Sequence, residues 1–182
     1  MSRQRLGVYT NSWFDRGRPV WVEVLWLLLG LLVASSIPGS QMRTALLRLF
    51  GARIGDGVVF KPRIVIKFPW KLAIGDNTWI GEGVWLDNVD QITIGSDCCL
   101  SQGVYVCTGN HDWSKETFDL VIQPVTVNAG AWLGAFARIG PGVTIGEDAV
   151  VAMGAVALED VADNAVVQGN PATTLRQRFR SD

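Results

Sequence analysis

The chain has 182 residues, of which 48% are apolar and 18% charged, and its formal net charge is −1. This length fits one domain with an appendage, the apolar content excludes a disordered chain, and the balanced charge gives no sign of a nucleic-acid partner. The charge is unevenly spread, because residues 1–53 hold seven Lys/Arg against two Asp/Glu. The first third of the chain therefore faces a different environment from the rest.

The apolar run over residues 20–37 predicts a helix, because Pro19 suits a helix start and Pro38 with Gly39 suits a stop. A spanning helix needs ~20 apolar residues, and Glu23 interrupts a run that is already short. A secretory signal is disfavoured by the long segment that precedes the run. Two readings remain besides these, a helix lying on or dipping into the membrane surface and a helix packed against protein.

Basic residues flank this run on both sides, which argues against a crossing because Lys and Arg gather on the cytoplasmic side. Tryptophans near the run suit a membrane interface. The flanking residues are Arg16, Arg18, Arg43, Arg48 and Arg53, and the tryptophans are Trp13, Trp21 and Trp26. A second helix is expected over about 41–50, with Ser40 as its N-cap and its end at Gly51.

A six-residue repeat begins at residue 54 and runs in groups of three hexads that start at 54, 74, 94, 127 and 145. Every first position is apolar, Gly takes the second position seven times, and the fifth position is small or apolar in twelve of fifteen hexads. The three exceptions, Trp70, Asp90 and Asn110, each lie in the third hexad of a group, where extra residues also enter. This pattern predicts triangular coils of 18 residues with positions one and five pointing inward.

The hexad frame resembles that of the hexapeptide-repeat acyltransferases, which fold as left-handed parallel β-helices, an exception to the right-handed crossover rule. The resemblance implies a β fold of about five coils over residues 54–172, with a loop at 112–126. Residues 1–53 would form an N-terminal helical extension and residues 173–182 a short basic C-terminal tail.

The chain holds a single histidine, His111, so zinc sites built on two or three histidines, including that of a γ-type carbonic anhydrase, are excluded within one chain. No metal is expected. Cys98, Cys99 and Cys107 form no CxxC pair and are typical of reduced thiols in the cytoplasm. His111 stands where the third coil breaks into the long loop, and insertions in repeat arrays often build the binding face.

In the resembled family a loop of this kind carries a catalytic histidine, and His111 matches it. The chain is similar almost end to end to colanic-acid biosynthesis acetyltransferases. The segments that carry this similarity are NSWFDRGRP at 11–19, LRLFGARIG at 47–55, WLDN at 85–88, CTGNHDWS at 107–114 and GNPA at 169–172. This implies an O-acetyltransferase that moves acetyl from acetyl-CoA to a sugar hydroxyl of an exopolysaccharide or its lipid-linked precursor.

In the implied mechanism His111 takes the hydroxyl proton, the oxygen attacks the thioester and backbone N–H groups hold the oxyanion. Cys107 is a rival acyl carrier. Asp112 either orients the imidazole or caps its turn, and the Asp87–Asn88 pair either binds the sugar or only forms a turn. The expected substrate contacts are Asp87, Asn88, Asn110 and Asp112.

The family binds pantetheine in a groove between neighbouring subunits of a homotrimer. The matching positions are Trp132, Gly134, Ala135, Met153, Gly154 and, for the CoA phosphates, Arg176, with Arg178 and Arg180 able to share that role. Glu159 departs from the pattern, because relatives often carry Lys there. That change puts the nucleotide end of the CoA site in doubt.

Three other functions stay open. An acyl carrier protein could be the donor, a sugar amine could be the acceptor, or the protein could be a non-catalytic trimeric scaffold. The apolar N-terminal region favours a membrane-bound polyprenyl-linked glycan, and a place at the inner face of the cytoplasmic membrane.

Overall fold

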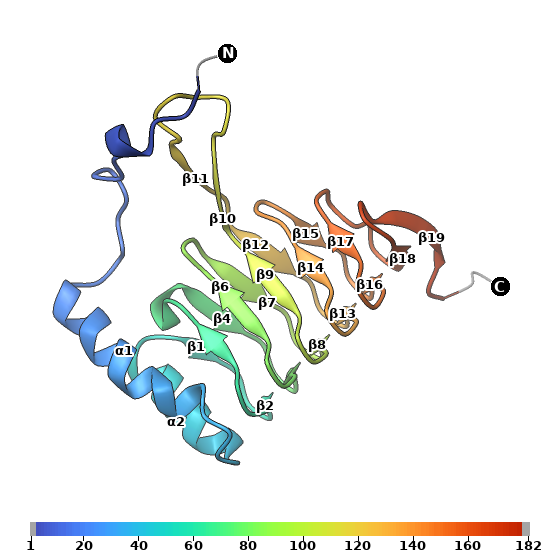
Figure 1. The fold of residues 1–182 in the computed structure, drawn as a ribbon. Coiled ribbons are helices and arrows are strands. Elements are labelled where there is room, and N and C mark those ends of the chain that lie inside the picture. The colour runs from blue at the N-terminus through green and yellow to red at the C-terminus, as the bar shows by residue number, and fades with distance from the viewer. Residues whose placement is uncertain (1–2, 180–182) are drawn as a thin grey trace.

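The hexads wind into a triangular prism whose three walls are sheets of short parallel strands (Figure 1). The computed structural model describes residues 3–179, so Arg180 lies outside the described residues. The first wall contains β1 (Arg53–Ile54), β4 (Leu72–Ile74), β7 (Ile92–Ile94), β12 (Val125–Val127) and β15 (Thr144–Ile145). The second contains β2 (Val59–Phe60), β5 (Trp79–Ile80), β8 (Cys99–Leu100), β13 (Trp132–Leu133), β16 (Val150–Val151), β18 (Ala165–Gln168) and β19 (Thr173–Gln177). The third contains β3 (Val65–Ile66), β6 (Trp85–Asp87), β9 (Tyr105–Cys107), β14 (Arg138–Ile139) and β17 (Val156–Ala157).

The interior of the prism is filled by the hexad positions that the sequence predicts. All fifteen first positions are buried, and they stack in rows such as Phe60, Ile80, Leu100, Leu133, Val151 and Val167 along the second wall. Twelve of the fifteen fifth positions are buried, and the three that are not are the exceptions noted above. The predicted left-handed parallel β-helix is confirmed, with a partial sixth turn after the five expected coils.

At several corners, glycine at the second hexad position is required by the approach of the next coil. A Cβ atom on Gly146 would lie 2.4 Å from the backbone nitrogen of Asp163, and one on Gly95 would lie 2.6 Å from that of Ala129. Any side chain at these corners would separate neighbouring coils, so Gly fixes the coil spacing.

Two helices, α1 (Val20–Val33) and α2 (Ser40–Leu49), cover the first coil (Figure 1). The Trp26 indole N–H of α1 donates to the carbonyl of Ile66 at 2.9 Å, and Val33 and Leu47 are buried with it. Within residues 3–179 no helix reaches the length and apolarity that crossing a membrane requires.

Helix α1 ends four residues before the apolar run does, because the buried Arg43 guanidinium fixes the chain that follows the helix. Arg43 donates to the carbonyls of Val33, Ser35, Ile37 and Gly39 at 2.7–3.2 Å.

The expectation that Ser40 caps α2 is wrong, because Ser40 is the first residue of that helix and Gly39 precedes it as the N-cap. The Ser40 hydroxyl instead donates to the carbonyl of Val58 and accepts from the N–H of Phe60, which ties α2 to β2.

Each end of the solenoid has its own irregular segment. At the C-terminal end β19 pairs antiparallel with β18, so residues 173–177 of the expected tail form a strand. Residues 3–18, which include the short 3₁₀ helix η1 (Leu6–Val8), run from α1 to a hairpin that leaves the third coil. A second 3₁₀ turn, η2 (Pro69–Lys71), lies beside that segment.

Candidate active site

His111 lies on a hairpin that projects away from the solenoid (Figure 1). Strand β10 (Gly109–His111) pairs antiparallel with β11 (Leu120–Ile122), and His111 itself is opposite Leu120. The expected interruption of the third coil is therefore an ordered two-stranded element with its histidine at the end of the first strand. Because the hairpin leaves the prism, a residue on it can reach groups that no wall residue reaches.

The His111 ring is held by Phe118, which lies in the turn of the hairpin. Nδ1 is 2.9 Å from the Phe118 carbonyl oxygen, and the two rings stack with centroids 4.3 Å apart and planes 3° apart. A carbonyl oxygen only accepts hydrogen bonds, so Nδ1 carries the proton and Nε2 of the neutral ring keeps its lone pair. This is the tautomer that a general base needs.

The neighbours of His111 in the sequence shape the hairpin turn. The Asn110 side-chain oxygen accepts from the His111 backbone N–H at 2.8 Å. Asp112 accepts from the N–H and the hydroxyl of Ser114, and these bonds lower the pKa of the Asp112 carboxyl. Of the two roles considered for Asp112, the contacts support the turn cap, since Phe118 and not Asp112 receives the imidazole N–H.

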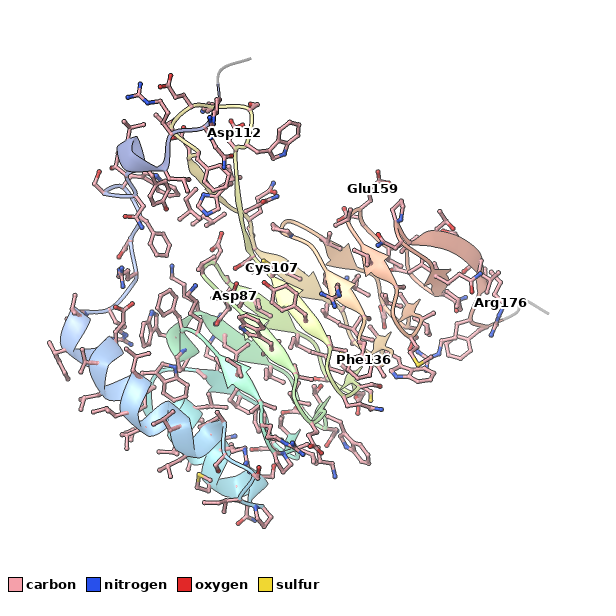
Figure 2. All side chains as sticks on the ribbon, in the orientation of Figure 1. Asp87, Cys107, Asp112, Phe136, Glu159 and Arg176 are labelled. Carbon is pink, nitrogen blue, oxygen red and sulfur yellow. The ribbon has the colours of Figure 1, made fainter. Side chains whose placement is uncertain are left out.

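Asp87 lies at the edge of the third wall and is held there by two partners. Lys67 Nζ lies 3.2 Å from one carboxylate oxygen, and the Tyr105 hydroxyl donates to the other at 3.2 Å. Burial, together with the Cys107 thiol and the Asp87 carboxylate beside it, raises the pKa of Tyr105, which keeps its proton for this bond. Figure 2 shows Asp87 and Cys107 on adjacent coils, in agreement with their strand register.

Asn88 is fully buried and unavailable to a substrate in this conformation. Its amide donates to the carbonyls of Phe68 and Lys71, and its carbonyl oxygen accepts from the N–H groups of Lys67 and Phe68. The expectation that Asn88 contacts the sugar is therefore corrected to the turn role, because every bonding site of the amide already serves the coil below.

A groove of about 390 Å³ opens between α1 and the third wall. Trp85 and Asp87 line its solenoid side, and Arg16 and Glu23 line its helical side. Glu23 is 9% exposed, and one of its oxygens pairs with Arg16 at 2.7 Å while the other has no protein partner. This groove could not be predicted from the sequence, because Glu23 stands there only as an interruption of an apolar run.

The residues expected to bind pantetheine lie together at one corner of the prism. The N–H of Gly154 donates to the Ala135 carbonyl at 2.9 Å, and Gly134 lies so close to the Met153 nitrogen that a Cβ would be 2.6 Å from it. Trp132 is half exposed and donates its indole N–H to the Ser101 hydroxyl at 3.0 Å.

Arg176 belongs to the same row of the second wall as Trp132. The register runs from Trp132 through Val150 and Val166 to Arg176, which is three strand spacings, or about 14 Å. Arg178 instead donates to the carbonyls of Gly130 and Asp148, so it braces the fold. In Figure 2, Glu159 lies away from Arg176, and Phe136, an exposed aromatic without a hexad role, lies on another edge.

Comparison with known proteins agrees with this arrangement. The family description "Bacterial transferase hexapeptide (six repeats)" matches residues 124–157. The chain is 36% identical over 170 residues to WcaF of Escherichia coli (strain K12), assigned as a colanic acid biosynthesis acetyltransferase, with 93% of each protein covered. It is 24% identical over 140 residues to the galactoside O-acetyltransferase of the same strain, covering 75% of this chain and 69% of that one.

Among solved structures, a hexapeptide-repeat acetyltransferase of Vibrio cholerae O1 biovar eltor, complexed with acetyl-coenzyme A, superposes with a TM-score of 0.80 at 27% identity. The match covers 88% of this chain and 89% of that one. The identity to WcaF extends through the N-terminal helices as well as the coils, since it covers nearly all of both proteins. On this evidence the chain belongs to the hexapeptide-repeat acetyltransferases.

Proposed function

We propose that the protein is an O-acetyltransferase that moves acetyl from acetyl-CoA to a sugar hydroxyl of an exopolysaccharide or of its lipid-linked precursor. The observation that carries this proposal is the bond from His111 Nδ1 to the Phe118 carbonyl, which leaves Nε2 ready to accept a proton. The similarity to WcaF and to a galactoside O-acetyltransferase supports a sugar hydroxyl as the acceptor.

The reaction is a direct transfer. His111 Nε2 accepts the hydroxyl proton while the hydroxyl oxygen bonds to the thioester carbonyl carbon. The C–S bond then breaks, the acetyl ester forms, and the imidazolium returns its proton to the CoA thiolate. A covalent route through Cys107 is less favoured, because its thiol donates to the carbonyl of Gly109 at 3.0 Å and is only half exposed.

The acetyl-CoA arm would lie along the row from Trp132 to Arg176. Trp132 offers an apolar face, and the corner formed by Gly134, Ala135, Met153 and Gly154 lets a chain approach the backbone closely. Arg176 is exposed at the far end of the row and carries the positive charge that phosphates require. The acetyl-CoA complex of the Vibrio cholerae relative supports this donor.

The acceptor sugar would occupy the groove between α1 and the third wall. The exposed Trp85 ring provides a flat apolar surface for the C–H face of a sugar. Asp87 lines the groove, is partly exposed and accepts hydroxyl hydrogen bonds, and Asn110 on the hairpin is exposed for a further one. The two cations of the groove are already paired with carboxylates, which favours a neutral ligand.

The outer face of α1 supports binding at a membrane surface, where a lipid-linked acceptor would be found. It exposes Val20, Trp21, Val24, Leu25, Leu27, Leu28, Leu31 and Leu32. Arg18 precedes this face and would attract anionic headgroups at the inner leaflet. By analogy with the family, we infer a homotrimer whose sites lie between subunits.

The test measures free thiol released from acetyl-CoA, with polyprenyl-linked glycans as acceptors, for the wild type and His111→Ala. We expect acceptor-dependent release that His111→Ala lowers by about 10²–10⁴-fold, the usual contribution of a general base. Binding of acetyl-CoA and the oligomeric state, read in the same samples, should not change. Hydroxylamine should cleave the product, since it attacks esters and leaves amides intact.

Each part of the proposal can fail separately. Undiminished turnover in His111→Ala would show that His111 is not the base. A hydroxylamine-resistant product would identify an amine acceptor. A wild-type protein that binds no acetyl-CoA would overturn the donor and favour an acyl carrier protein or a scaffold.

A further inference from the structure

The segment over residues 5–18, which we call the strap, joins the helical end of the molecule to the His111 hairpin. The end of the strap that lies farther from the hairpin is fixed to η2. There the Trp70 indole N–H donates to the Arg16 carbonyl at 2.6 Å, and Lys71 Nζ donates to the Asp15 carbonyl at 2.9 Å. The same Lys71 Nζ lies 4.7 Å from the centre of the Phe14 ring. This end of the strap is therefore attached to the rigid solenoid.

The other end of the strap is attached to the hairpin turn. The Arg5 backbone N–H donates to the Glu116 carbonyl at 2.8 Å, and the Arg5 guanidinium pairs with the Glu116 carboxylate at 2.9 Å. Figure 1 shows this part of the chain running beside the hairpin, far from the coils. The strap thus gives the hairpin a second connection to the body, in addition to its own two strands.

Between these attachments the strap brings Tyr9 to the catalytic imidazole. The ring centres of Tyr9 and His111 are 5.6 Å apart with planes inclined by 60°. His111 therefore contacts one aromatic ring from its own hairpin and one from the strap.

Such support matters because the hairpin alone is a weak scaffold. It has only three paired positions per strand, and a two-stranded hairpin of this size is marginally stable in water. A general base must be held within a fraction of an ångström of its working position, and a loose one loses much of its effect.

We propose that the strap positions His111 for proton transfer, with Tyr9 as a positioning residue and the Arg5–Glu116 contact as the anchor. This inference rests on the proposed function, because it takes His111 as the base. The strap continues directly into α1, so the same segment joins the base to the apolar helix.

The first test uses the fact that the chain has one histidine. In untagged, full-length protein labelled with ¹³Cε1-histidine, a proton–carbon correlation spectrum contains one imidazole signal. Tyr9→Ala should shift and broaden that signal and lower kcat about tenfold, with KM for acetyl-CoA unchanged. Tyr9→Phe keeps the ring and should match the wild type in both measurements. An unchanged imidazole signal in Tyr9→Ala would overturn the role of Tyr9.

The second test exchanges the charges of the anchor. Arg5→Glu and Glu116→Arg should each lower kcat about two- to fivefold, and the double exchange should restore it, while the backbone bond of Arg5 stays in all three. The effect is small because both side chains are exposed. Glu82→Arg breaks a comparably exposed ion pair with Arg63 on the solenoid and serves as the matched control, with no expected change.

The two tests separate this inference from the proposed function. The imidazole signal is read without turnover, so it reports on the strap even if His111→Ala stays active. If His111→Ala is inactive and the double charge exchange fails to restore kcat, the Arg5–Glu116 contact is not the anchor, while His111 remains the base.

Discussion

The solenoid and the segments attached to it are stabilised in different ways, the solenoid by repeated burial and the segments by single contacts. In the coils every first hexad position is buried, and neighbouring coils are joined by the same backbone bonds from one wall to the next. In the strap and the hairpin few residues are buried, and a few named contacts, such as Arg5–Glu116 and His111–Phe118, fix the geometry. Repetition supplies rigidity, and the proposed base lies where repetition is interrupted.

The largest effect should come from a cavity in the repeat. Leu100 is fully buried in the middle of its row, so Leu100→Ala should cost about 3 kcal/mol of unfolding free energy. Denaturant unfolding of the whole chain measures this. Leu158→Ala removes the same atoms from an exposed side chain and should change stability by less than about 0.5 kcal/mol. Similar losses for the two variants would contradict the predicted difference between interior and surface.

A smaller and more local effect is expected at the helical end. Arg43→Met leaves four carbonyls without their donor and should destabilise the α1–α2 pair by about 2–3 kcal/mol. Hydrogen exchange should accelerate in the helices while the β-strand amides stay protected. Arg53→Met, at an exposed position, is the control. Equal acceleration in the strands would mean that helices and coils unfold as one unit.

The proposed acetyl-CoA row, from Trp132 to Arg176, can be tested by affinity. Trp132→Ala should raise KM for acetyl-CoA about tenfold, which is about 1.4 kcal/mol, because the arm loses its apolar surface. Trp79 occupies the same row two strands away and is similarly exposed, so Trp79→Ala should leave KM unchanged. A rise in KM for both variants would place the arm along the other half of the wall.

The smallest effect concerns pH and the hairpin. Hydrogen bonds from Ser114 lower the pKa of Asp112, and bonds from Thr117 and Lys115 lower that of Asp119. A carboxyl whose folded pKa is depressed stabilises the fold above its unfolded value, 3.8, and loses that contribution as pH falls through the folded value. The protection of the β11 amides against exchange, relative to an unfolded chain at the same pH, should therefore fall below about pH 4. The coil amides should lose their protection only at lower pH.

Asp112→Asn removes one of these titrating groups and should weaken the pH dependence of the hairpin. Glu159→Gln, an exposed change on the solenoid, should leave it as in the wild type. If hydrogen exchange of the hairpin in Asp112→Asn still follows the wild-type pH curve, ionisation of Asp112 does not stabilise the hairpin.

The sequence predicts the solenoid well because its period is set by steric rules that each hexad repeats. Burial of position five even fails at the three residues where the pattern fails, Trp70, Asp90 and Asn110. The same rules place His111 at the break, but they do not predict that the tail folds back as β19 and brings Arg176 into one row with Trp132. They say nothing of how a hairpin turns or what it meets outside the coils.

The parts that the sequence left open depend on contacts between distant segments. The Phe118 carbonyl and the Tyr9 ring reach His111 from positions that carry no periodic signal. Asn88 has the polar character of a sugar ligand, and only its burial among the backbone groups of residues 67–71 reveals its structural role. Ser40 has the chemistry of a helix cap, but the nearness of β2 gives its hydroxyl other partners.

The antiparallel pairing of β18 with β19 also determines the length of the molecule. A stack of parallel coils has no internal reason to stop, and its last exposed edge would accept a strand from another chain. Reversal of the chain at β19 ends the parallel stack of the second wall, and α1 with α2 covers the first coil at the opposite end. Because the second wall ends in a strand of reversed direction and the first coil lies under two helices, the parallel stacking of coils does not continue directly from one copy into the next.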